Sequence, residues 1–159
     1  MPSFVNTMTS AEWKSMREKA GIEKTKWWKG AGPSVGSKLE AWQKARREVK
    51  AVLNEMKIPT YIYKRGDMTK MSKAFDTLNA LEAAIKAMLK IADKKEIPVE
   101  KAKDFDAMKN HLNLLLVEIE GKKPKYSKAL LALKPLKDGD KQSAVKGAIS
   151  DNFAWFDPK

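Results

Sequence analysis

Two ionisable side chains inside apolar helical patterns are the first candidates for chemistry, because groups in such places often have shifted pKa values. The only histidine, His111, lies at the flank of an apolar stripe, and Glu82 lies between Leu78 and Ile85 on another. A catalytic interpretation makes Glu82 an acid with a raised pKa and places His111 close to it. A structural interpretation makes both groups satisfied members of a helical core.

Arg46 holds a comparable position on the apolar seam of a second predicted helix. We expect Glu82 and Arg46 to pair and to set the register of their helices, as polar seam residues often do. A single histidine and the absence of cysteine exclude tetrahedral zinc and two-histidine iron sites, and no Glu-x-x-His pair is present for a di-iron site. We therefore expect no catalytic residue, no metal and no cofactor, and we favour a non-enzymatic protein.

Two short motifs carry little weight. Residues 30–38 hold spare glycines ahead of a helix start, as phosphate-binding loops do, but no strand precedes them and the Gly-Lys-Ser/Thr order is absent. Arg65-Gly66-Asp67 matches a cell-adhesion tripeptide that is common by chance. We interpret it as a turn with a helix cap.

A run of lysines and tryptophans over residues 24–30 is chemically richer. Aromatic rings stack on bases and lysines contact phosphates, which makes Lys26, Trp27, Trp28 and Lys29 candidate contacts to a nucleic acid. The same residues would suit a lipid interface, where tryptophan prefers the headgroup level. A third interpretation has one tryptophan folding back as a lid on the helices.

Further candidate contacts lie in two basic clusters: Arg46 and Arg47 in one, and Lys122, Lys123 and Lys125 in the other. The second cluster opens the most basic third of the chain. Lysines act as point charges, so such clusters give salt-sensitive binding that tolerates changes of sequence.

The charge of the whole chain agrees with these clusters. Its 32 Lys and Arg against 20 Asp and Glu give +12, which favours contact with polyanions, although a surface kept soluble by like charge is the simpler alternative. The absence of cysteine fits a reducing compartment, and we expect a cytoplasmic protein. We find no pattern of a signal peptide and no apolar run long enough for a transmembrane segment.

Apolar residues at steps of three and four predict long helices over about 37–57, 69–95 and 98–120. The stripe of the 69–95 helix is the clearest, so we expect it to be buried by the other two. Leu114 to Val117 make the third helix apolar nearly all round, which predicts a centrally buried segment. Short connections favour antiparallel neighbours. We therefore expect an all-α, single-domain antiparallel bundle of three long helices with short flanking helices.

Local signals set the expected ends of the helices. Capping boxes at Thr9–Glu12 and Ser37–Glu40 predict helix starts, and Gly21 and Gly121 predict helix ends. The glycines and proline of residues 21–36 predict an irregular connector.

The chain divides into an N-terminal helix and connector over 1–36, a bundle core over 37–121 and basic helices over 122–159. In the last part we expect short helices over 127–134 and after Asp140. Three aromatic residues within 152–156 predict a tail that docks onto the bundle.

These patterns lead to three hypotheses. The first is a non-enzymatic helical protein that binds an anionic macromolecule, either nucleic acid or an acidic protein. The alternative is a self-associating structural subunit of a larger assembly, such as a phage particle or a secretion apparatus. The third is an enzyme or toxin that uses Glu82 and His111.

Overall fold

The computed structural model describes residues 4–21, 31–92 and 99–149 of the chain. Within these ranges the regular elements are helices, apart from an isolated antiparallel bridge between Ile62 and Lys141. The prediction of an all-α protein is therefore confirmed. The lysine–tryptophan run and the aromatic tail lie outside the described residues, so their predicted roles stay predictions.

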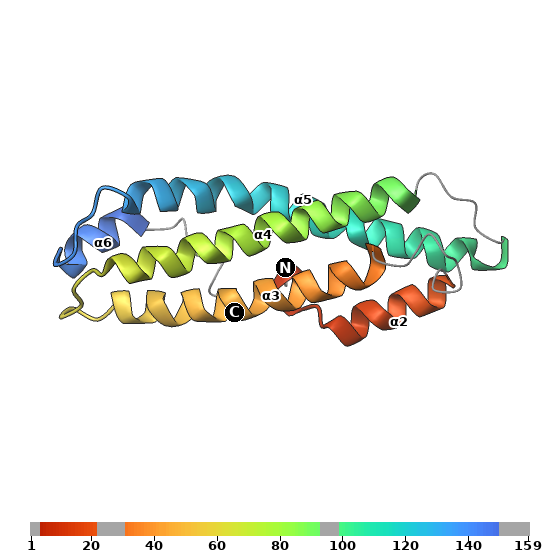
Figure 1. The fold of residues 1–159 in the computed structure, drawn as a ribbon, viewed down its shortest axis with the longest axis horizontal. Helices are drawn as coiled ribbons and strands as arrows, with labels where there is room; N and C mark the ends of the chain where they lie inside the picture. Colours follow the sequence, from red (N-terminus) through yellow and green to blue (C-terminus); the bar gives the residue numbers. More distant parts are fainter. Residues whose placement is uncertain (1–3, 22–30, 93–98, 150–159) are drawn as a thin grey trace.

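Three long helices form most of the molecule: α3 (Ala31–Met56), α4 (Arg65–Ala92) and α5 (Ala102–Leu133). They lie along the long axis with α4 between α3 and α5, and successive helices run in opposite directions (Figure 1). No helix in the described part of the chain is long and apolar enough to cross a bilayer.

Short elements cover the sides of these helices: α1 (Phe4–Thr7), α2 (Ser10–Ala20), the 3-10 turn η3 (Val99–Lys101) and α6 (Gln142–Ile149). Helices α1 and α2 contact both α3 and α5, and α6 contacts α5 and α3. The Trp42 indole N–H donates to Asn6 Oδ1 at 2.9 Å, which fastens α1 to α3. The predicted ends of α2 are confirmed, because Thr9 Oγ1 accepts from the Glu12 N–H and Gly21 is left-handed with a φ of 72°.

The predicted stripe of α4 is the spine of the core. Its large apolar members on this face are Met71, Leu78, Leu81, Ile85 and Met88, all fully buried. Tyr126 of α5 packs beside them, with its hydroxyl donating to the Met71 carbonyl. Its ring stacks on Phe75 at 5.2 Å between centroids and meets Trp42 edge-on at 6.5 Å. The burial of this stripe confirms the central expectation drawn from the sequence.

The predicted starts of α3 and α4 are wrong. Residues 31–36 are helical rather than irregular, and Ser37 caps nothing because its hydroxyl donates to the Ser34 carbonyl inside α3 at 3.0 Å. At Gly36 an added Cβ would lie 3.2 Å from the Trp13 indole, so this glycine allows α2 to pack closely. Helix α4 begins at Arg65, which places the tripeptide with Asp67 in its first turn.

The predicted end of the third long helix is also wrong. Helix α5 continues through Gly121 and Pro124 to Leu133 and absorbs the short helix expected over 127–134. The buried face resumes at Tyr126, two turns after Ile119, and the half-buried Lys122 and Lys123 lie between them. Packing of this face outweighs the local preferences of glycine and proline.

The segment from Leu114 to Val117 is not buried on all sides. Leu114 is 57% exposed and Val117 is 67% exposed, while Leu115 between them is fully buried. Helix α5 lies at the outside of the molecule, so only one of its faces meets the core.

Candidate functional site

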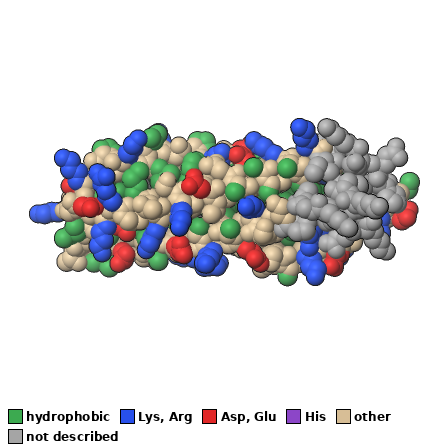
Figure 2. Space-filling model, viewed as in Figure 1, with side chains coloured by type: hydrophobic (Ala, Val, Ile, Leu, Met, Phe, Trp, Pro, Cys, Tyr) green, Lys and Arg blue, Asp and Glu red, His purple; other side chains and the backbone are tan. Residues whose placement is uncertain are grey.

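The end of α3, the start of α4, the end of α5 and the whole of α6 lie together at one end of the molecule (Figure 1). Residues 50–76 and 125–149 form this part of the molecule, which we call the basic end. They contain twelve Lys or Arg and five Asp or Glu. Every one of these cations except Lys50 is exposed. Figure 2 shows Lys and Arg side chains over this end, with others along the rest of the visible face. Such a surface attracts polyanions and holds them without reading their sequence.

Backbone bonds between distant segments fix the basic end. The Tyr63 N–H donates to the Asp140 carbonyl at 2.9 Å, and the Gly139 N–H donates to the Tyr63 carbonyl at 3.1 Å. The Arg65 N–H donates to Asp138 Oδ1 at 2.7 Å. Gly139 has a φ of 97°, which a side chain would strain. The loop before α4 and the turn before α6 therefore form one ordered unit.

A groove of about 580 Å³ lies beside this unit, between the first turns of α4 and the end of α5. Three cations and two hydroxyl groups line it together with a tyrosine, two apolar residues and one carboxylate. These residues are Arg65, Lys73, Lys134, Thr69, Ser72, Tyr63, Met68, Leu136 and Asp76. The donors outnumber the single carboxylate, so the groove suits an anion.

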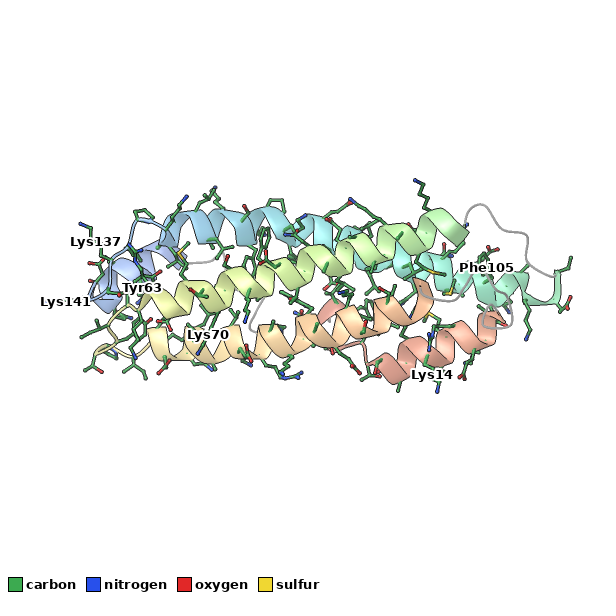
Figure 3. The ribbon with its side chains drawn as sticks, in the orientation of Figure 1. Lys14, Tyr63, Lys70, Phe105, Lys137 and Lys141 are labelled. Atoms are coloured by element: carbon green, nitrogen blue, oxygen red, sulfur yellow. The ribbon has the colours of Figure 1, made fainter. Side chains whose placement is uncertain are left out.

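Tyr63 is the most informative residue of the groove (Figure 3). It is 1% exposed, and its hydroxyl has no hydrogen-bond partner among the described residues. Burial, followed by the negative charge of Asp67, raises the pKa of this hydroxyl, so it stays a neutral donor. The neighbouring Tyr61 differs, because its hydroxyl donates to Asp67. A buried donor without an acceptor is costly, so a shift of the surrounding side chains that opens this hydroxyl to an anion in the groove would be favourable.

The structure places the predicted contact residues in different environments. Lys26, Trp27, Trp28 and Lys29 lie outside the described residues. Arg47 and Lys125 are exposed, Lys122 is half-buried, and Lys123 is half-buried and ion-paired. Arg46 is only 7% exposed, so it offers little surface to a partner, and its role as a contact stays a prediction. It belongs to the apolar seam of α3, where its neighbours bury it.

The predicted pairing of Glu82 is corrected as well. Glu82 Oε1 accepts from Lys123 Nζ at 2.8 Å, and the second oxygen lies 4.0 Å from Lys86. Its ion-pair partners are thus lysines of α5 and of its own helix rather than Arg46.

His111 lies far from Glu82, on another part of the bundle. Its Nε2 is 3.1 Å from Met8 Sδ, and its ring meets Phe4 edge-on at 5.6 Å. At 1.5 Å per residue, roughly 18 Å of α5 separates His111 from the lysine that binds Glu82. The two residues of the catalytic hypothesis are therefore not brought together. Among the described residues, no group of three acidic or histidine side chains is placed to hold a metal ion.

The groove residues Tyr63, Arg65, Lys73 and Lys134 were missed at the sequence level. They are separated by up to 71 positions, and no local pattern links them. The bridge between Ile62 and Lys141 brings their segments together.

His111 should make stability depend on pH. Burial lowers its pKa, and the charge of Glu12 opposes this only in part. The unfolded chain then binds the proton more readily, so this contribution is complete above about pH 6.5 and is lost as the pH falls through the folded pKa. Denaturant unfolding at pH 7.5 and 5 should show a larger loss for the unaltered protein than for His111→Leu. Parallel pH profiles would contradict this, since the carboxylates titrate in both proteins.

Comparisons of the chain with protein-family models, with curated proteins and with solved structures found no match. No relative therefore supplies a function. The function has to be inferred from the charge, the groove and the exposed faces described above.

Proposed function

We propose that the protein binds nucleic acid through its basic end, by contacts with phosphates and without catalysis. The groove lined by Arg65, Lys73 and Lys134, beside the unused Tyr63 hydroxyl, is the observation that supports this proposal. In this proposal one phosphate occupies the groove, and the surrounding lysines contact its neighbours along the strand. The three long helices act as an antiparallel bundle that holds these contacts rigidly.

Nucleic acid is favoured over an acidic protein by the composition of the surface. Protein interfaces are depleted in lysine, whereas interfaces with DNA are more polar and much more positive. Eleven of the twelve cations of the basic end are lysines and one, Arg65, is an arginine, so few side chains here can read base edges by paired hydrogen bonds. The expected binding is tolerant of sequence. Lys26, Trp27, Trp28 and Lys29 remain predicted additional contacts, through stacking and phosphate binding.

A pair of double variants with equal change of charge tests the location. Lys73→Glu with Lys134→Glu alters the groove, and Lys38→Glu with Lys103→Glu alters exposed lysines outside the basic end. We expect the groove pair to weaken duplex binding about 10- to 100-fold more than the control pair, because charged hydrogen bonds are lost and repulsion replaces them. Fluorescence anisotropy of a labelled duplex at fixed salt measures the dissociation constants of both double variants.

Thermal unfolding of both double variants checks that they remain folded. Equal weakening by the two pairs overturns the proposal, since net charge alone would then explain binding. Failure of the unaltered protein to bind DNA or RNA at low salt also overturns it, and an acidic protein becomes the partner to test.

The structural-subunit hypothesis depends on a different surface. Exposed apolar side chains on α5 favour it, because isolated ones are ordinary but several on one helix face mark an interaction site. Self-association is compatible with binding at the basic end. The enzyme hypothesis has no comparable support, since Glu82 and His111 lie apart.

A further inference from the structure

The outer face of α5 carries large apolar side chains that no described residue covers. Leu114 is 57% exposed, Val117 is 67% exposed and Leu131 is 65% exposed. Their exposure is unusual on a helix whose opposite face is fully buried. Contact with solvent does not account for large apolar side chains at these positions, because polar side chains would be better hydrated there. Several such side chains on one face indicate an interaction surface.

These side chains belong to one continuous stripe with alternating steps of three and four residues. Its members are Leu114, Val117, Gly121, Pro124, Lys128 and Leu131. An average step near 3.5 residues is the spacing of a seam between two helices. A Cβ added at Gly121 would meet nothing within 4 Å, so the middle of the stripe is open and a second helix can approach closely.

The stripe is complementary to itself when a second copy of α5 lies antiparallel to the first. A two-fold axis between Lys122 and Lys123 places Leu114 level with Leu131 of the second copy. The same axis places the small Gly121 level with Pro124. A two-fold interface of this kind uses the same patch on both chains.

The charges of α5 also require the antiparallel direction. The helix has four carboxylates and two lysines before Gly121, and four lysines and no carboxylate after it. Antiparallel copies set the acidic half of one against the basic half of the other, whereas parallel copies set like charges together. Glu120 and the exposed Lys125 lie on opposite flanks of the stripe, so this attraction acts between the halves of the two helices and not through one close ion pair.

We infer that two copies of this chain associate through the outer face of α5 as an antiparallel, two-fold symmetric pair centred between Gly121 and Pro124. The second copy is the occupant of the stripe because shape and charge both match at the same axis. Such a pair points its two basic ends in opposite directions. The interface includes Lys125 and Lys128 of the basic end but none of the residues that line the groove, so the oligomeric state and binding at the groove can be tested separately.

Sedimentation equilibrium of the full chain tests the inference. We expect a species of twice 17.9 kDa at micromolar concentration. Leu114→Lys with Leu131→Lys should raise the dissociation constant at least about 100-fold, because four leucines leave the interface and four charges enter it. Ile58→Lys with Val99→Lys, at exposed apolar positions off the stripe, should leave it unchanged.

Two charges introduced at one position separate this geometry from general hydrophobic association. Val117→Lys should weaken the pair about tenfold more than Val117→Glu, because the antiparallel register sets position 117 level with Lys128 of the second copy, which repels a lysine and attracts a carboxylate. Circular dichroism confirms that each variant is folded. A monomer at all concentrations, a pair insensitive to the leucine variants, or equal weakening by the two Val117 variants each overturns the inference.

Discussion

The affinity of the protein for duplex DNA should fall by a factor of about 1,000 to 100,000 between 50 and 200 mM salt. This range corresponds to six to ten phosphate contacts, each of which releases condensed counterions when it forms. The eleven exposed cations of the basic end are enough to supply that number. A plot of log binding constant against log salt, from anisotropy of a labelled duplex, measures the number of contacts directly.

The slope of that plot also locates the contacts. Lys73→Glu with Lys134→Glu should make the slope shallower by about two units, at roughly 0.9 per phosphate contact, whereas Lys38→Glu with Lys103→Glu should leave it unchanged. A single-stranded ligand should give a lower slope, near 0.7 per contact. Affinity that stays constant over this salt range would show that the lysines serve only to keep the protein soluble.

The features predicted well from the sequence are those that depend on local periodicity. The stripe from Met71 to Met88 is buried as expected, because steps of three and four residues define a helix face whatever packs against it. The ends of α2 could be predicted equally well, because Thr9 and Gly21 act within one turn of the helix that they bound. Local signals suffice when the interaction that they describe is local.

The features predicted poorly depend on contacts between distant segments. Helix α3 begins early because α2 packs against Gly36, and Arg46 is hidden because its helix is covered at that seam. The excess of positive charge was evident in the composition, but its concentration at one end follows from how the chain folds. Nothing near Tyr63 in the sequence indicates that Asp140 pairs with its backbone.

Replacement of Gly121 and Pro124 by alanine should stabilise the protein by about 3.5 to 4 kcal/mol in total. Glycine inside a helix costs roughly 0.5 to 1 kcal/mol relative to alanine, and proline about 3 kcal/mol. A Cβ at Gly121 meets no atom within 4 Å, and Pro124 is exposed, so neither change causes a clash within the chain. Pro124→Ala also restores an N–H that can donate to the Glu120 carbonyl.

Chemical denaturation measures the free energy of unfolding of both single variants and of the double variant. All of these proteins also carry Leu114→Lys and Leu131→Lys, so that self-association does not contribute to the differences. Gly139→Ala is the matched control, because its φ of 97° should make the same substitution destabilising by about 1 kcal/mol or more. The change in the free energy of unfolding should therefore have opposite signs at the two glycines. The helix continues through Gly121, whereas the turn at Gly139 requires a positive φ. If Gly121→Ala destabilised the protein instead, residue 121 would be a left-handed helix end, and the continuous stripe on which the α5 pair depends would not exist.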